Sequence, residues 1–151
     1  MSTPINAPDL TKRPPRSPRV RLGGLVILPR MLDKGRAAIA GAVGDYHFDC
    51  PMDGYVKSFL DFDAEGLKAQ LAAGKGDGEV LEWILAHSKN KPTEVEVAAW
   101  SEYVEHSATT IPKLRGFIHE TQAEIAPDRT DIGTLFDLLD VDDHVSYGGK
   151  A

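Results

Sequence analysis

Apolar residues recur every three or four positions along most of this 151-residue chain, which is the spacing of amphipathic helices. The cleanest run of this kind joins Leu114, Phe117, Ile118, Thr121 and Ile125. Alternation with a period of two, the pattern of a half-buried strand, is scarce. The pattern predicts an all-α fold, a compact bundle of five or six helices.

Capping residues predict where these helices begin. Pro29 is a favoured first residue for the first helix, which ends before Gly41. A T-x-x-E sequence forms a capping box, which is a specific helix start. The capping box is Thr93–Glu96, and the other predicted starts are Pro51, Asp63, Asp77 and Thr130 or Asp131. The sequence GKGDG at 74–78 is typical of a flexible connector.

The first predicted helix has one apolar face and three basic residues. Its apolar stripe consists of Leu28, Leu32, Gly35 and Ile39. On a helical wheel Arg30 and Lys34 lie opposite this stripe, so we expect both side chains to be in solvent. Arg36 lies next to Leu32, and we expect it at the edge of the core.

Residues 1–21 contain five prolines and lead into the first apolar run, Leu22–Leu28. Each proline disfavours the helical conformation of the residue before it, so this segment is predicted to be extended. One interpretation is a partly disordered tail. We prefer an arm laid across the domain surface, because the segment leads directly into an apolar anchor. The predicted organisation is an extended Pro/Arg-rich arm at 1–21 and a single helical domain at 22–151.

Charge is divided unevenly along the chain, whose net charge is −6. Residues 1–36 carry eight Lys or Arg against two Asp, while the remaining residues carry nine Lys or Arg against 21 Asp or Glu. The acidic whole argues against a dedicated duplex-DNA binder. A local basic patch can still hold a phosphate, a carboxylate or an acidic partner.

Other features of the composition place the protein in the cytoplasm. The longest uncharged apolar run, at 22–29, is far shorter than the roughly 20 residues of a membrane helix. The N-terminus has no apolar signal-peptide region. A single cysteine allows no intrachain disulfide, which fits a reducing compartment. We expect a cytoplasmic protein with no membrane partner.

The basic residues of the arm and the first helix form the candidate binding site. A guanidinium group is a planar set of donors that suits bidentate recognition of phosphate or carboxylate. If the arm folds back on the helix, the candidate ligand-binding residues are Arg16, Arg19, Arg30, Lys34 and Arg36. Alternatively, these side chains face solvent or pair with the acidic C-terminal residues Asp137, Asp140, Asp142 and Asp143.

Cys50 is a weaker candidate, for catalysis. A nucleophilic cysteine needs a nearby base or a helix N-terminus, and His47 and Pro51 offer these features. However, Asp49 and Asp53 flank the thiol, and lone cysteines are commonly buried packing residues. The five histidines show no metal-binding spacing, so we expect no metal and no cofactor.

Four segments carry a resemblance to a known family. They are DLTKRPPRSPRVRLGG (9–24), LPRMLDKGRA (28–37), YHFDCPMDG (46–54) and TDIGTLFDLLDVDD (130–143). They resemble a family of bacterial proteins catalogued only as a domain of unknown function, over nearly the whole chain. Near Phe62 the family tends to carry a short Gly-Ile-Asp insertion that this chain lacks. The resemblance implies a small bacterial helical protein and brings no activity and no catalytic residues.

The sequence therefore favours a non-catalytic binding protein for an anionic small molecule or an acidic partner. A thiol-dependent enzyme that uses Cys50 with His47 as its base is one alternative. A structural subunit is another, in which the arm crosses to a second copy and forms a homo-oligomer. A nucleic-acid partner is not expected.

Overall fold

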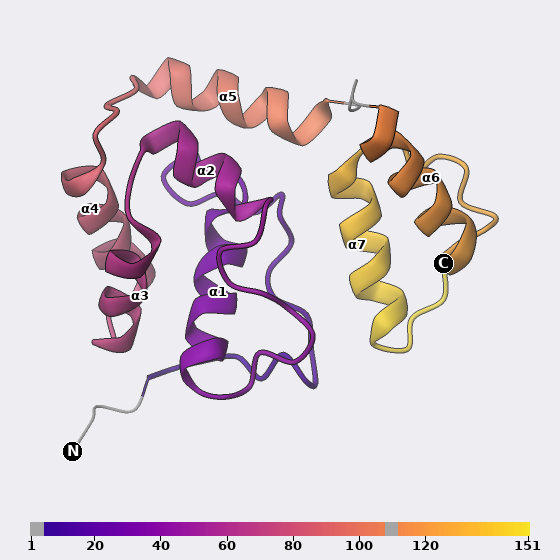
Figure 1. Cartoon of the computed structure of the whole chain (residues 1–151), viewed down its shortest axis with the longest axis horizontal. Helices are drawn as coiled ribbons and strands as arrows, with labels where there is room; N and C mark the ends of the chain where they lie inside the picture. The colour runs from indigo at the N-terminus through magenta and orange to yellow at the C-terminus, as the bar shows by residue number, and fades with distance from the viewer. Residues whose placement is uncertain (1–4, 108–111) are drawn as a thin grey trace.

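The computed structural model of the chain describes residues 5–107 and 112–151 (Figure 1). These residues form seven helices: α1 (Leu28–Ile39), α2 (Asp53–Leu60), α3 (Ala64–Ala72), α4 (Asp77–His87), α5 (Glu94–His106), α6 (Pro112–Ile125) and α7 (Leu135–Ser146). Within the same residues, the only extended pairing is an isolated bridge between Leu22 and Leu25. The all-α prediction is confirmed for this part of the chain.

The predicted number of five or six helices is too low. The short helix predicted to start at Pro51 is present as the two-turn helix α2, which begins at Asp53. It ends at Asp61, which adopts a left-handed conformation with φ 57° and so stops the helix before α3 begins. None of the described helices is long and apolar enough to cross a membrane.

Helix starts follow the predicted caps at two positions and differ at a third. Asp63 and Thr93 both cap their helices, each accepting a hydrogen bond from a first-turn amide. α4, in contrast, has Gly76 as its N-cap, so Asp77 is the first helical residue and not the cap. The Asp77 carboxylate is therefore free to bind groups outside its own helix.

The last helix also begins later than predicted. α7 is capped by Thr134, whose side chain accepts a hydrogen bond from the Asp137 amide. Asp131 does not act as a cap, because its carboxylate pairs with Arg129 in the turn that precedes the helix.

α1 lies at the centre of the molecule and is buried on nearly all sides. Arg30 and Lys34 are each 3 % exposed, so the prediction that both lie in solvent is wrong. α7 and the start of α2 supply the carboxylates of Asp143 and Asp53 to the polar face of this helix, and the arm supplies the Arg16 carbonyl. A helical wheel considers one helix alone and cannot include these neighbours.

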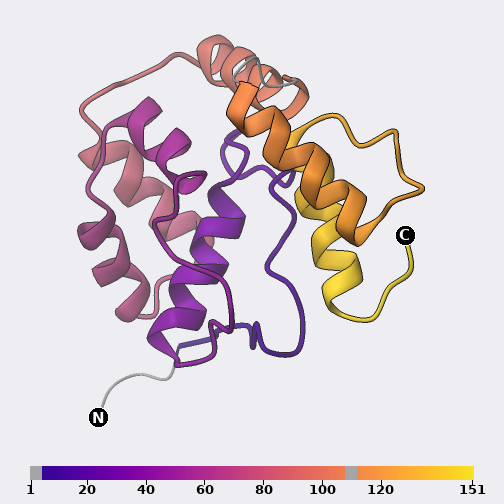
Figure 2. The ribbon, with the colours of Figure 1, turned by 45° about the vertical axis from the view of Figure 1, so that its right-hand side comes forward.

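The arm lies between α1 and α7, as Figure 2 shows. Its described part, residues 5–21, contains no helix, whereas residues 1–4 of the predicted arm lie outside the described chain. Near the start of the arm the Tyr147 hydroxyl donates to the Leu10 carbonyl at 2.5 Å. At its end the Ile27 amide donates to the Pro18 carbonyl at 2.9 Å. The arm is therefore tied to both the C-terminal helix and the segment that begins α1.

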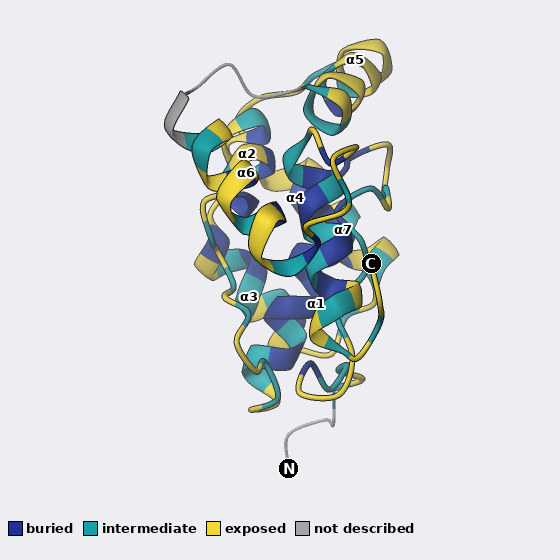
Figure 3. Cartoon of the chain, turned by 90° about the vertical axis from the view of Figure 1, so that its right-hand side faces the viewer, coloured by how far each residue is buried: buried dark blue, intermediate teal, exposed yellow. Residues whose placement is uncertain are grey.

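α6 and α7 lie side by side and share a small apolar cluster of their own (Figures 1 and 2). α7 also contributes Phe136 to the main cluster around α1, so it joins the two cores. α5 crosses one end of the molecule with most of its surface exposed (Figure 3). Its buried residue Ser101 donates to the Gly24 carbonyl at 2.6 Å and anchors this helix to the turn before α1.

Candidate anion-binding cavity beneath the N-terminal arm

The structure separates the predicted basic residues into three groups. Arg16 and Arg36 line a cavity beneath the arm, which we call the arm cavity. Arg30 and Lys34 line a second cavity on the other side of α1, which we call the hairpin cavity because α6 and α7 form one wall. Arg19 lines neither cavity and binds α7. The five residues therefore do not converge on a single anion.

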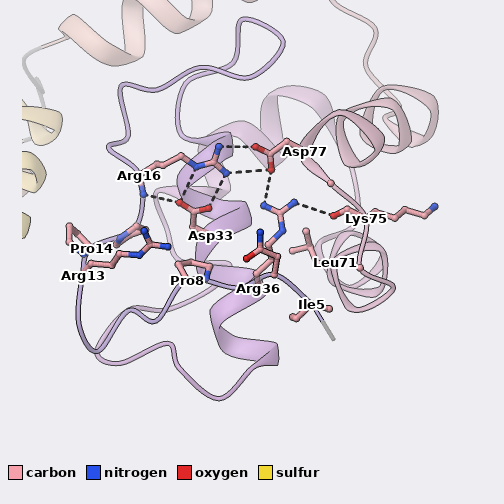
Figure 4. Close-up of a pocket in the computed structure, with 14 residues that line it drawn as sticks. Ile5, Pro8, Arg13, Pro14, Arg16, Asp33, Arg36, Leu71, Lys75 and Asp77 are labelled. Atoms are coloured by element: carbon pink, nitrogen blue, oxygen red, sulfur yellow. Dashed lines mark hydrogen bonds and ion pairs between the residues drawn. The ribbon is translucent and has the colours of Figure 1, made fainter. Parts of the chain in front are cut away.

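Two arginines and two aspartates form a network on one wall of the arm cavity (Figure 4). The Arg16 guanidinium contacts Asp33 through its Nε and Nη2 atoms, at 3.0 and 2.9 Å, and the Arg16 amide also donates to Asp33. Its Nη1 atom reaches the Asp77 carboxylate at 2.7 Å. Arg36 donates to the other oxygen of Asp77, also at 2.7 Å. The Asp77 carboxylate thus lies between two guanidinium groups, and each of its oxygens accepts a hydrogen bond from one of them.

The arm cavity has a volume of about 560 Å³ and is walled by the arm, α1 and the turn between α3 and α4. Three arginines and two carboxylates line it: Arg13, Arg16, Arg36, Asp33 and Asp77. Arg13 is exposed, and among the described residues its guanidinium has no hydrogen-bond or ion-pair partner. Lys75 reaches the network through its backbone carbonyl, which accepts a hydrogen bond from Arg36 at 3.2 Å, whereas its side chain points away and its ammonium contacts the Gln70 side-chain oxygen at 2.6 Å (Figure 4). The cavity therefore has an excess of positive charge.

Sequence reasoning missed Arg13 and Lys75 as site residues. Arg13 lay inside the predicted arm, but it was not separated from its neighbours because spacing carries no information in an extended segment. Lys75 belongs to the GKGDG sequence, which was predicted to be only a connector. The connector is the turn that brings the start of α4 against the arm, and this contact is visible only in three dimensions (Figure 4).

The titration of Asp77 reflects its place between the arginines. Burial by itself would raise the pKa of this carboxyl, but hydrogen bonds from Arg16 and Arg36 outweigh it and hold the pKa below its ordinary value. Because the folded-state pKa is the lower one, the network stabilises the fold above about pH 4, the ordinary carboxyl pKa, and that stabilisation is lost as the pH falls through the folded-state pKa.

Asp77→Asn tests this pH dependence. The wild type is expected to be the more stable protein near neutral pH. The difference in unfolding free energy is expected to shrink as the pH falls below about 4, where the unfolded chain binds the proton, and to be lost once the pH passes the lower folded-state pKa of Asp77. Urea unfolding of both proteins at a series of pH values measures it. A difference that stays constant down to the acid limit of folding would contradict the assigned network.

Arg19 and Arg30 tie the arm and α1 to α7. Arg19 binds Asp137 and Asp140, with its Nε atom 2.9 Å from Asp140. The Arg30 guanidinium makes two hydrogen bonds to Asp143, at 2.7 and 3.2 Å. These two arginines therefore pair with the acidic C-terminal residues, as the alternative interpretation of the sequence predicted.

Cys50 and His47 both line the hairpin cavity. The group that contacts the Cys50 sulfur is Lys34, whose ammonium lies 3.2 Å from Sγ and 2.9 Å from the Asp53 carboxylate. Within the described residues, His47 has no hydrogen-bond partner, and no group of three or more His, Cys, Asp or Glu side chains is arranged to hold a metal ion. A base role for His47 remains a prediction.

In the part of the chain that the structure describes, these features define an all-α protein with a charged cavity between its N-terminal segment, α1 and the turn before α4. The chain belongs to the family described as Domain of unknown function (DUF5069), whose model matches residues 12–145. The resemblance to a family without a known function is thereby confirmed. None of the curated proteins compared with the chain is similar enough to count as a match. The family description assigns no activity, so function has to be argued from the geometry.

Proposed function

We propose that this protein binds a small anionic molecule in the arm cavity, without catalysis. The observation that carries the proposal is the charge of the cavity walls, where the three arginines Arg13, Arg16 and Arg36 outnumber the two carboxylates. Arg13 supplies the positive charge that carboxylates of the described chain do not neutralise. Its guanidinium can therefore contact a phosphate or carboxylate without breaking an internal ion pair.

The start of α4 adds to this electrostatic preference. Gly76, its N-cap, has no side chain to accept hydrogen bonds from the first-turn amides. Gly76 and Asp77 both line the cavity, so the positive end of the helix dipole lies at its wall. Helix N-termini of this kind favour bound anions, and here the effect adds to that of the side chains.

The shape of the site supports a small molecule in preference to an acidic protein surface. Cavities of about 300–1,000 Å³ are typical of small-ligand sites, and the arm cavity falls in that range. Pro8, Pro14 and Leu71 give it apolar walls beside the charged groups. The proposed ligand class is therefore a compact organic phosphate or polycarboxylate.

Isothermal titration calorimetry with inorganic phosphate, citrate and ATP tests the proposal. Arg13→Ala is expected to weaken binding of the anion that binds most tightly by roughly tenfold, because a charged hydrogen bond contributes about 1.5 kcal/mol or more. Asp77→Asn is expected to strengthen it, since the substitution removes the internal carboxylate that competes for Arg16 and Arg36.

Lys12→Ala is the matched control. Lys12 is the neighbour of Arg13, carries the same charge, and its side chain is 81 % exposed outside the cavity. A non-specific effect of net charge would weaken binding equally in both variants. Equal affinities of Arg13→Ala and Lys12→Ala, or no binding of any of the three anions, would contradict the proposal.

A further inference from the structure

The hairpin cavity differs from the arm cavity in its chemistry. It has a volume of about 760 Å³ and lies between α1, the segment at 44–52 and the α6–α7 pair. Its two basic residues are already neutralised, Arg30 by Asp143 and Lys34 by Asp53. The acidic residues Asp45 and Asp142 also line it. Arg30 and Lys34 could therefore bind an anion in this cavity only by giving up their internal ion pairs.

Two hydroxyl groups of the cavity wall also bind within the protein, whereas His47 has no hydrogen-bond partner in the described residues. The Tyr46 hydroxyl donates to Asp143 at 2.8 Å, and the Tyr147 hydroxyl donates to the Leu10 carbonyl. Burial and, to a smaller extent, the charge of Asp143 raise the pKa of the Asp142 carboxyl. This shift indicates that the environment of Asp142 disfavours negative charge.

Another part of the wall is apolar. Its side chains are Leu10, Pro51, Met52, Phe117, Leu135 and Leu139. Phe117 is 53 % exposed although it lines the cavity. Small-molecule sites are lined mainly by hydrophobic and aromatic side chains, so this part of the wall can contact an apolar ligand.

We infer that the hairpin cavity is a second binding site, for a neutral, largely aromatic small molecule that contacts Phe117 and reaches the wall at Cys50. The inference does not depend on anion binding in the arm cavity, because the two cavities share no lining residue. Cys50 is the only cysteine of the chain, so its alkylation reports on the occupancy of this cavity alone.

A titration with the neutral fluorescent probe N-phenylnaphthylamine tests the inference. The probe is expected to bind the wild type with saturation at one molecule per chain and to slow alkylation of Cys50 by iodoacetamide. Phe117→Ala is expected to weaken probe binding by about tenfold, because it removes aromatic contact area with the ligand. Anilinonaphthalene sulfonate carries the same ring system with an added negative charge, and it is expected to bind more weakly than the neutral probe.

Tyr103→Ala is the control for dye adsorption to exposed aromatic groups. Tyr103 lies on α5 outside the cavity and is 71 % exposed, more than Phe117. An equal loss of binding in Phe117→Ala and Tyr103→Ala would overturn the inference, as would saturation by the probe with no protection of Cys50. Equal or tighter binding of the sulfonate would overturn the assignment to neutral ligands.

Discussion

Arg30→Met is expected to lower the free energy of unfolding by about 3–5 kcal/mol, the usual cost of removing one partner from a buried ion pair. The Arg30 side chain is 3 % exposed and that of Asp143 is 10 % exposed. Without the guanidinium, the Asp143 carboxylate keeps only the Tyr46 hydroxyl among its described side-chain partners. The charge of the carboxylate then remains buried without compensation, and this remaining charge is the main source of the loss.

Urea unfolding of three variants separates this effect from the general loss of an arginine. Arg129→Met removes an exposed pair with Asp131 and is expected to lower the unfolding free energy much less than Arg30→Met does, because water screens the exposed pair. Arg30→Met/Asp143→Leu is expected to recover most of the loss, although the Tyr46 hydroxyl then lacks its acceptor. Equal losses in Arg30→Met and Arg129→Met would show that the pair is not buried as described.

Local sequence signals predicted the parts of the fold that depend on neighbouring residues. Asp63 and Thr93 cap the expected helices because a capping hydrogen bond involves residues only two or three positions apart. The same reasoning also predicted Asp77 as a helix cap, and this prediction was wrong, because Asp77 is the first residue of α4. Its carboxylate instead binds Arg16 and Arg36, 61 and 41 residues away in the sequence.

The candidate site was predicted only in part, for the same physical reason. The sequence indicated a basic arm and acidic C-terminal residues, and the contacts of Arg19 with α7 follow that division of charge. It did not indicate that Arg30 and Lys34 are buried, because their partners Asp143 and Asp53 come from distant segments. Neither could the position of Lys75 at the arm cavity be predicted from a glycine-rich connector.

The arm combines a structural role with its place in the proposed site. Arg16 binds Asp33 of α1 and Asp77 of α4, so a single arm residue connects two helices of the body. The same side chain lines the arm cavity. A ligand bound there would add contacts to a segment that also holds α7, and we therefore expect anion binding to stabilise the whole fold and not only the cavity.

Lys34→Met is expected to cost about 3–5 kcal/mol of unfolding free energy, since the Asp53 carboxylate is completely buried and Lys34 is its cationic partner. One oxygen of Asp53 already has no hydrogen-bond partner in the described chain, so little remains to stabilise its charge once the ammonium is removed.

Urea unfolding measures the loss, with Lys57→Met as the control. Lys57 forms a comparable contact with Asp49 at 2.7 Å, but both side chains are about one-third exposed, and the expected change is below about 1 kcal/mol. Asp53→Asn in the Lys34→Met background is expected to restore part of the stability, because it removes the uncompensated charge. If Lys34→Met and Lys57→Met cost the same, burial does not determine the strength of this pair.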